Sequence, residues 1–348
     1  MRMKEIKYSF TDDYSEGCHQ SILELLVATN KVQQLGYSHD EYSERARGLI
    51  REQMKSESAD IHFVSGGTQA NLIVVSAMLR PHEAVIAAST GHVFSNEAGA
   101  IESVGHKVIS VDTDNGKLNA MLIKETLRGF DHAPHVVKPR MVYISNTTEL
   151  GSVYSAKELR ELYAFCMHNS LLLFIDGARL GSALSIGEVD ISMADMANYC
   201  DVFYIGGTKN GALLGEAIVI NNDELKLDFK YHLKQKGALL SKGRTIGIQF
   251  LGLFTDNLFY DLAIHANQMA RKISDALQRV GVEFFVEPIS NQVFPILTDE
   301  QILALGANYN FHIWRKMDNG NSAFRIICSW ATPEVVVDEF IVDVLAVI

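Results

Sequence analysis

The sequence predicts an α/β protein of two domains, in which a mainly parallel sheet of seven strands is covered by helices on both faces. Three observations lead to this prediction. Short apolar runs rich in β-branched residues recur through the first two thirds of the chain, and helical patterns separate them. After about Asp228, long helical segments and a few short strands replace this alternation. We therefore expect a large domain over residues 1–250 and a smaller α+β domain over residues 251–348.

Seven runs are predicted to form the large sheet. Leu171–Ile175 (LLLFI) is apolar throughout, which is typical of a central strand that is buried on both faces. The full set is Ile61–Ser65, Ala84–Ala88, Lys107–Val111, Met141–Ser145, Leu171–Ile175, Val202–Ile205 and Ala217–Ile220.

Helical patterns lie before and between these strands. Ser155 and Glu158 have the spacing of a capping box, which marks a helix start. The expected helices of the large domain are Ser21–Thr29, Tyr42–Lys55, Gln69–Leu79 and Leu159–His168. In the small domain we expect helices at Leu251–Phe259, Ala263–Val280 and Pro333–Val347, and strands at Glu283–Val286, Gln292–Pro295 and Ala323–Ser329.

The composition excludes several classes of partner. The 31 Lys and Arg residues against 42 Asp and Glu residues give a net charge of −11, and no run of clustered basic residues offers a surface to a polyanion. Nucleic acid and membrane are therefore not expected as partners. The four cysteines show no metal-binding or disulfide spacing, no stretch reaches the about 20 apolar residues of a membrane helix, and we expect a cytoplasmic protein.

Candidate ligand-binding residues follow the predicted strands, because ligands of parallel sheets gather where the strands end. After the first strand comes Ser65–Asn71 (SGGTQAN), with a helical pattern that opens at Thr68. Glycines allow a close approach to the backbone, and a helix start favours an anion such as a phosphate. A plain turn between a strand and a helix is an equally good interpretation of this stretch taken alone.

Two further strand ends carry charged residues. The apolar strand LLLFI runs directly into Asp176, and a buried carboxylate there needs a partner. The alternatives are an Asp176 that caps the next turn, an ion pair with Arg179, and an anion that faces a ligand. Lys209 follows another strand within Gly206–Gly211 (GGTKNG). A lysine among small residues can be desolvated, which lowers its pKa and favours the neutral amine that Schiff-base chemistry requires. An exposed loop lysine is the alternative.

Together these residues match the needs of pyridoxal 5'-phosphate. The aldehyde of this cofactor needs an amine (Lys209), its pyridine nitrogen needs an anion (Asp176), and its phosphate needs a cradle (Gly67 and Thr68). All three come from ends of one predicted sheet, so they can converge. We therefore predict a pyridoxal-phosphate enzyme.

Four stretches resemble a known family. They are Ser65–Asn71, His92–Gly99 (HVFSNEAG), Asp176–Arg179 (DGAR) and Gly206–Lys209 (GGTK). Over about residues 12–330 the chain resembles the low-specificity threonine aldolases, within the β-eliminating lyase and threonine aldolase group of fold type I pyridoxal-phosphate enzymes. This resemblance implies the fold of that group. It also implies a carbon–carbon lyase that cleaves threonine or allo-threonine between Cα and Cβ to give glycine and an aldehyde.

The resemblance also implies roles for cofactor-binding residues. Lys209 would form the Schiff base with the cofactor until the amino group of the substrate displaces it, and Asp176 would pair with the pyridine nitrogen. The electrons of the broken bond would then pass into the ring as a quinonoid. His92 would stack on the ring. The phosphate would bind at Gly67 and Thr68, and Thr208 would also contact the cofactor.

The remaining implied contacts come from basic residues. Arg179 would lie near the ring hydroxyl and, with Arg325, would hold the carboxylate of the substrate; Arg325 as a solvated strand residue is the alternative. Lys234 and Lys242 match a basic segment that reaches the phosphate of a neighbouring subunit, although a lysine-rich surface loop needs no special reason. A homodimer or homotetramer with shared active sites is implied.

The base that acts on the β-hydroxyl stays open between several groups. His92 is one candidate, directly or through a water, with Glu97 as its competitor, and a purely stacking His92 is an alternative. Where many family members have a second histidine, this chain has Thr148 and Glu149, so Glu149 is a further candidate or binds a different side chain. The segment Thr11–Tyr14 (TDDY) also departs from the family pattern, which leaves the preferred substrate and its stereochemistry open.

Other functions and sites are weaker interpretations. Another β-eliminating amino-acid lyase and a catalytically silent pyridoxal-phosphate-binding protein remain alternatives to the aldolase. His132 and His135 lie close together, but they have no further ligand at metal-binding spacing, so we expect no metal site. His62 and His106 fall in or beside strands and are expected to be packed residues.

Overall fold

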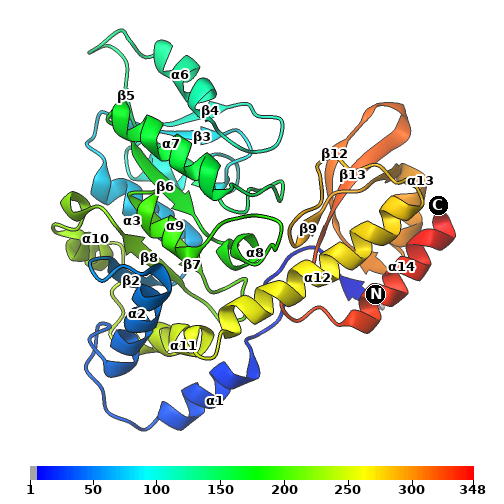
Figure 1. The fold of residues 1–348 in the computed structure, drawn as a ribbon, viewed down its shortest axis with the longest axis horizontal. Helices are drawn as coiled ribbons and strands as arrows, with labels where there is room; N and C mark the ends of the chain where they lie inside the picture. Colours follow the sequence, from blue (N-terminus) through cyan, green and yellow to red (C-terminus); the bar gives the residue numbers. More distant parts are fainter. Residues whose placement is uncertain (1–5) are drawn as a thin grey trace.

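The computed structural model describes residues 6–348. Figure 1 shows a larger α/β part and a smaller part, and the long helix α12 (Leu258–Arg279) runs from one to the other. Both ends of the described chain lie in the smaller part, beside the last helix. The described chain thus leaves the small part near its start, builds the large part, and returns.

The large sheet has seven strands in the order β2-β8-β7-β6-β5-β3-β4. All neighbours pair in parallel except at β8, which is antiparallel to both β7 and β2. The strands are β2 (Asp60–Val64), β3 (Glu83–Ala88), β4 (Val108–Val111), β5 (Lys138–Ser145), β6 (Leu172–Asp176), β7 (Val202–Gly206) and β8 (Glu216–Ile220). Each of them overlaps one predicted run, so the mainly parallel seven-stranded sheet is confirmed.

This topology brings several chain segments to one edge of the sheet. Strands β2, β3, β5, β6 and β7 all run in the same direction and therefore end at the same edge, whereas the antiparallel strand β8 begins there. Strands β6 and β7 are buried along their whole length, because their apolar residues face helices on both sides. Polar residues just past these strand ends are thereby held on a rigid base.

Helices cover both faces of the large sheet. Ser155 caps α7 with a capping box to Glu158, as the sequence predicts. Helix α3 begins at Gly67, two residues before the predicted helix Gln69–Leu79. The helices are α1 (Gln20–Thr29), α2 (Glu41–Met54), α3 (Gly67–Met78), α4 (His92–Ser95), α5 (Ala100–Ser103), α6 (Ala120–Arg128), α7 (Ala156–His168), α8 (Leu180–Leu184), α9 (Met193–Asn198), α10 (Phe229–Gln235) and α11 (Arg244–Phe254), with a 3₁₀ turn at Asp223–Leu225.

The small part has its own sheet and core. Strand β13 is its centre and pairs with β9, β10 and β12, all antiparallel. The elements after α12 are β9 (Gln292–Val293), β10 (Ile296–Thr298), α13 (Asp299–Leu305), β11 (Tyr309–Asn310), β12 (His312–Lys316), β13 (Asn321–Ile327) and α14 (Glu334–Val347), with a 3₁₀ turn at Asp318–Gly320. Strand β1 (Tyr8–Ser9) pairs with β11, and Phe10 packs into the same core. The division of domains at residue 250 stays a prediction, and this N-terminal segment packs with the C-terminal part.

Two predictions for the small part are wrong. The predicted helix Leu251–Phe259 is broken, because α11 ends at Phe254 and the chain turns at Asp256 and Asn257, which both have positive φ. Helix α12 then starts at Leu258 rather than at Ala263. Glu283–Val286 forms only an isolated bridge between Phe284 and Pro295 instead of a strand. The polar residues Thr255, Asp256 and Asn257 interrupt the first segment. The second, Phe284–Val286, is rich in strand-forming residues, so packing rather than local propensity decides its conformation.

Candidate active site

A cavity of about 290 Å³ lies at the edge where the parallel strands end. Ligand pockets typically start at about 300 Å³, so it has room for one small molecule. Its wall includes the predicted phosphate cradle at Gly67 and Thr68, the predicted carboxylate Asp176 and the predicted lysine Lys209. The lining residues are Tyr14, Ser65, Gly66, Gly67, Thr68, His92, Ser145, Thr147, Glu149, Asp176, Ala178, Arg179, Tyr204, Thr208, Lys209, Leu214 and Glu216.

The start of helix α3 forms one side of this cavity. Its N-cap residue, Gly66, provides no side-chain hydrogen bond, so backbone N–H groups of the first turn are available to an anion. A Cβ on Gly67 would come within 2.9 Å of the Tyr204 hydroxyl, so only glycine fits here without displacing the tyrosine. The predicted cradle is therefore present, with Thr68 beside it.

Asp176 lies at the end of β6 and is only 4% exposed. Its Oδ1 accepts a hydrogen bond from the Ala178 N–H at 2.9 Å, and its Oδ2 accepts one from the Tyr143 hydroxyl. The Asn71 amide is also within 3.5 Å of Oδ2. These donors fix the carboxylate at the cavity wall.

Lys209 follows β7 and contributes to the same cavity. Burial and the nearby positive charge of Arg179 lower the pKa of its ammonium group, while Asp13, Asp176 and Glu216 oppose this shift. Its Nζ lies 5.9 Å from the centre of the Tyr14 ring. The net downward shift makes the neutral amine more available at physiological pH, as the sequence analysis expects.

His92 and two glutamates occupy a third side of the cavity. The His92 Nδ1 is 2.8 Å from Glu97 Oε1, and this hydrogen bond raises the pKa of the imidazole. Asn71 also donates to Glu97 Oε1, at 2.7 Å. Glu149 Oε1 accepts hydrogen bonds from the Ser145 hydroxyl at 2.7 Å and from the His92 N–H at 2.9 Å. Burial raises the pKa of Glu149.

Glu97 has a side chain that is fully buried behind His92. It does not line the cavity, whereas His92 and Glu149 do. The structure therefore brings His92 and Glu149 together in the cavity wall. Glu97 contacts His92 but does not reach the cavity.

Arg179 lines the cavity, but it already has a partner. Its Nε and Nη2 donate to the two carboxylate oxygens of Asp13, at 2.7 and 3.0 Å. Asn291 donates to Asp13 as well, at 3.0 Å. This buried pair ties the N-terminal segment to the site. Asp13 lies in Thr11–Tyr14, the segment that departs from the family pattern, and nothing in its local sequence indicates this role.

Arg325 lies on β13 next to this pair and does not line the cavity. Its Nη2 donates to the Thr11 carbonyl at 3.4 Å, and its guanidinium lies 5.6 Å from the Trp314 ring centre. Its Nε is buried and has no partner in the described part of the chain. Burial and the charge of Arg179 lower its pKa, so a carboxylate between the two arginines would be favoured.

Lys234 and Lys242 lie away from this cavity. Lys234, on α10, has its Nζ 4.8 Å from the ring centre of Tyr37, and Lys242 is exposed in the turn before α11. Their predicted contact is with the phosphate of a neighbouring subunit, so it stays a prediction.

Several residues of the site escape sequence analysis. Tyr143 and Tyr204 lie within β strands, where an aromatic residue indicates only packing. Glu216 is the exception, because it is a lone carboxylate before an apolar run and opens a buried strand. Asp176 follows its apolar run whereas Glu216 precedes one, so the pattern marks a carboxylate at a strand end but does not tell that Glu216 lies at the same edge.

Comparisons with known proteins agree with this geometry. A family model described as beta-eliminating lyase matches residues 10–300. The chain belongs to this family. The predicted family and fold are confirmed, and the protein is a pyridoxal-phosphate-dependent lyase, as the sequence analysis predicts.

The chain is similar to two threonine aldolases and, more distantly, to an aminotransferase. A low-specificity L-threonine aldolase from a Pseudomonas species is 34% identical over 342 residues, which cover 97% of this chain and 96% of that protein. A threonine aldolase structure from Leishmania major has 43% identity and a TM-score of 0.95, covering 97% and 99% of the two chains. A Thermus thermophilus aspartate aminotransferase, at 14% identity and a TM-score of 0.71 over 99% and 92%, shares the fold.

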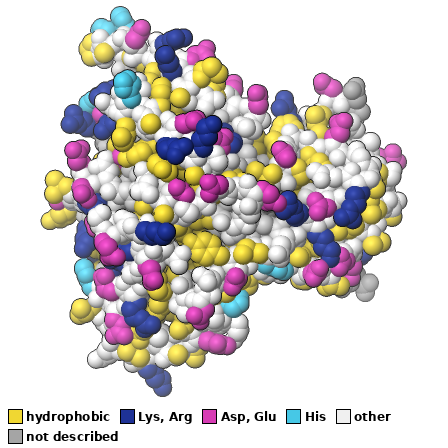
Figure 2. Space-filling view, viewed as in Figure 1, with side chains coloured by type: hydrophobic (Ala, Val, Ile, Leu, Met, Phe, Trp, Pro, Cys, Tyr) yellow, Lys and Arg dark blue, Asp and Glu magenta, His cyan; other side chains and the backbone are white. Residues whose placement is uncertain are grey.

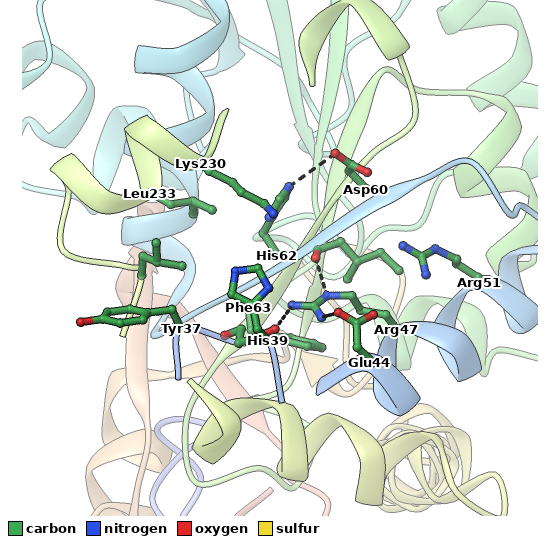
Figure 3. A pocket seen from close by; sticks show the side chains of 13 residues that line it. Tyr37, His39, Glu44, Arg47, Arg51, Asp60, His62, Phe63, Lys230 and Leu233 are labelled. Atoms are coloured by element: carbon green, nitrogen blue, oxygen red, sulfur yellow. Dashed lines mark hydrogen bonds and ion pairs between the residues drawn. The ribbon is translucent and has the colours of Figure 1, made fainter. Parts of the chain in front are cut away.

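The lyase has a second cavity, of about 170 Å³, between α2, β2 and α10 (Figure 3). His62 points from β2 toward Asp60, and burial lowers its pKa to about 3, so it is neutral. It packs on the Phe229 ring, 5.0 Å away, which confirms that it is a packed residue. Arg47 donates to Ile61 and Ser38 carbonyls and pairs with Glu44. The guanidinium of Arg47 thus already has its partners within the fold.

Neither the face drawn in Figure 2 nor His106, His132 and His135 points to a second functional site. On the face drawn in Figure 2, basic and acidic side chains alternate and do not gather into a patch. His106 is buried and bonds the Glu83 carbonyl at 3.0 Å, so it too is packed, and His132 and His135 stack on each other. Within residues 6–348, no helix could span a membrane and no group of three potential ligands could hold a metal ion.

Proposed function

We propose that this lyase cleaves the Cα–Cβ bond of a β-hydroxy-α-amino acid, threonine or allo-threonine, to give glycine and an aldehyde. The names of the relatives support this substrate class, since both a curated relative and a similar structure are threonine aldolases. The observation that carries the proposal is the meeting of Lys209, Asp176 and the glycine cradle in one cavity.

The residues of the cavity fit pyridoxal phosphate. Gly67 lacks the Cβ that would fill the cradle, and the uncapped start of α3 suits a phosphate. Asp176 is a buried anion with fixed orientation, as a pyridine nitrogen requires, and Lys209 is an amine with a lowered pKa. When bound, the cofactor supplies an aldehyde for the lysine and a ring that accepts the electrons of the broken bond.

The chain's own residues then have distinct tasks. Lys209 holds the cofactor as a neutral amine, and Asp176 keeps a proton on the ring nitrogen. Thr68 and Thr208 bind the phosphate, and His92 covers a face of the ring. Each of these side chains lines the cavity, which is the support for these roles.

Two arginines are proposed to bind the carboxylate of the substrate. Arg325 has a buried Nε without a partner in the described chain. A buried N–H donor without an acceptor costs free energy, and a bound carboxylate would supply the acceptor. Arg179 keeps its bond with Asp13 and adds positive charge. A carboxylate held there would fix the orientation of the bond that is cleaved.

The base for the β-hydroxyl is proposed to be His92 or Glu149. Both line the cavity, and they are connected through the His92 N–H. Glu97 lies behind His92, so its proposed role is to hold the imidazole through Nδ1, which leaves Nε2 for the substrate or a water. We also propose a cytoplasmic homodimer or homotetramer in which Lys234 and Lys242 reach the partner's cofactor.

A product assay tests the proposed function. The purified protein with cofactor is incubated with threonine, allo-threonine, phenylserine and a β-substituted amino acid. Glycine and an aldehyde are the expected products. Ammonia and an oxo acid without glycine would contradict the aldolase and favour another β-eliminating lyase. A bound cofactor without turnover of any amino acid would favour a silent binding protein.

A further inference from the structure

The short segment that leads into β9 lies against the large part of the protein. In Figure 1, β9 is on the side of the small part that faces α8. Ser290, Asn291 and Gln292 are all buried, and none of them lines the cavity. Strand β9 begins at Gln292 and pairs with β13, the strand that carries Arg325. The segment is thus placed behind the walls of the cavity rather than in them.

Gln292 contacts the turn that carries one of the proposed bases. Its Nε2 donates to the Thr148 carbonyl at 3.1 Å and lies 3.4 Å from the Thr147 hydroxyl oxygen. Thr147 lines the cavity, and the Thr148 carbonyl belongs to the peptide group that leads directly into Glu149. Gln292 therefore holds the backbone of Glu149 from the side away from the cavity.

The adjacent Asn291 supports the other side of the site. Its Nδ2 donates to Asp13 at 3.0 Å, and Asp13 binds Arg179, a proposed partner of the substrate carboxylate. Its N–H donates to the Ser182 hydroxyl of α8 at 3.3 Å. Two neighbouring side chains thus hold the carboxylate side and the hydroxyl side of the site separately. A change at Gln292 should therefore leave the carboxylate side intact.

The turn packs closely against the segment before β9. The Gly151 N–H donates to the Thr148 carbonyl at 2.9 Å, which closes the turn around Glu149. Gly151 has a φ of +78°, and a Cβ there would lie 2.8 Å from the Ser290 hydroxyl oxygen and 3.3 Å from the Gln292 Cβ. Only glycine allows this approach without strain. The turn thus rests directly on the small part.

Folding stability alone does not explain an amide at this buried position. The Thr148 carbonyl already accepts from the Gly151 N–H, so the hydrogen bond from Gln292 is its second. The Gln292 Oε1 is buried and has no partner in the described residues. An unpaired buried acceptor costs free energy, which offsets what the donor contributes. The amide is therefore better explained by the position of the turn than by the free energy of unfolding.

We propose that Gln292 is a positioning residue for the cleavage step. It holds the peptide group before Glu149, and Glu149 Oε1 accepts from the His92 N–H at 2.9 Å. Both proposed bases therefore depend on the position of this turn. Within the described chain, the side-chain hydrogen bonds of Gln292 go to Thr147 and Thr148 alone, so cofactor and carboxylate binding do not depend on it. This inference rests on the proposed cleavage of a β-hydroxy-α-amino acid.

The test compares Gln292→Met with the wild type, both with bound cofactor. Methionine has a length similar to that of glutamine but cannot donate to the Thr148 carbonyl. The rate of threonine or allo-threonine cleavage in a single turnover should fall about tenfold, because small displacements of catalytic groups slow the reaction strongly. The affinity for glycine, followed by the absorbance of the bound cofactor, should stay within about twofold, because glycine has the carboxylate but no β-hydroxyl.

Gln301→Met is the matched control. Gln301 also lies in the small part and donates through Nε2 to a backbone carbonyl, that of Val347 in α14, at 3.1 Å, but it does not line the cavity. This variant should keep the wild-type cleavage rate and glycine affinity. An unchanged cleavage rate in Gln292→Met would overturn the proposal, as would a loss of glycine affinity equal to the loss of rate. A Gln292→Met protein that fails to fold would also overturn it, because the role of the amide would then be stability.

A second measurement needs no reaction. Hydrogen exchange of the His92 amide, observed by NMR after selective isotope labelling of histidine, reports its hydrogen bond to Glu149. Exchange should be faster in Gln292→Met than in the wild type and unchanged in Gln301→Met. Equal exchange rates in all three proteins would contradict the positioning role. If the wild type cleaves no β-hydroxy amino acid, the proposed function fails, and this exchange rate alone decides the role of Gln292.

Discussion

Replacing Asp13 by asparagine should destabilise the protein strongly, because Asp13 neutralises the most charged part of the site. Its side chain is 1% exposed, and Arg179 binds both of its oxygens, at 2.7 and 3.0 Å. The Asp13→Asn variant would leave the Arg179 cation buried near Arg325 without its counter-charge. Removing one partner of a buried ion pair costs about 3–5 kcal/mol. We expect the free energy of unfolding to fall by this amount.

Urea-induced unfolding measures this loss. The midpoint should shift to lower urea while the slope of the free energy against urea stays the same. Asp12→Asn is the matched control, since Asp12 is the adjacent carboxylate and bonds only the Tyr14 N–H and the Ser15 hydroxyl near the surface. Asp12→Asn should change the free energy of unfolding by less than about 1 kcal/mol. An equal loss in both variants would refute the reasoning.

The loss should also depend on pH. Burial raises the pKa of Asp13, but the charges of Arg179 and Lys209 and the hydrogen bonds outweigh burial, so its net pKa in the folded protein is lowered. A carboxylate with a lowered folded pKa contributes stability above its unfolded pKa, about 4, and loses it as the pH falls through the folded value. The difference between wild type and Asp13→Asn should therefore be constant near neutral pH and shrink in acid. A difference that grows in acid would contradict this assignment.

Three further changes test the arrangement around the cavity. Tyr143→Phe removes a donor to Asp176, and titration of the cofactor-free variant should show about tenfold weaker binding of pyridoxal phosphate, whereas unchanged binding would argue against this donor. Glu97→Gln replaces the carboxylate that raises the pKa of His92 by a neutral amide, so NMR titration should find a lower imidazole pKa; an unchanged value would contradict the pairing. Gly67→Ala places a Cβ within 2.9 Å of a tyrosine hydroxyl and should weaken phosphate binding; wild-type affinity for inorganic phosphate would contradict the cradle.

The sequence predicts the large sheet well because its strands have strong local signals. The apolar runs that include Leu172–Ile175 and Val202–Ile205 leave little choice but buried parallel strands, and polar residues after such strands must meet at one edge. Asp176, Lys209 and the cradle at Gly67 could therefore be placed together without coordinates.

The rest of the site depends on contacts that are distant in the sequence. Asp13 binds Arg179, and Asn291 comes from the far end of the chain, so no local pattern links them. Glu216 reaches the site only because β8 is antiparallel, and the direction of a single strand cannot be inferred from its apolar pattern. In the small part, the turn at Asn257 similarly depends on packing rather than on periodicity.

Chemical trapping of the cofactor tests the central claim most directly. The protein is incubated with pyridoxal phosphate and reduced with borohydride, and the peptides are mapped by mass spectrometry. Our account predicts a single stable adduct on Lys209, and its loss in the Lys209→Ala variant. An adduct on another lysine, or none on the wild-type protein, would contradict the assignment of this cavity as the active site.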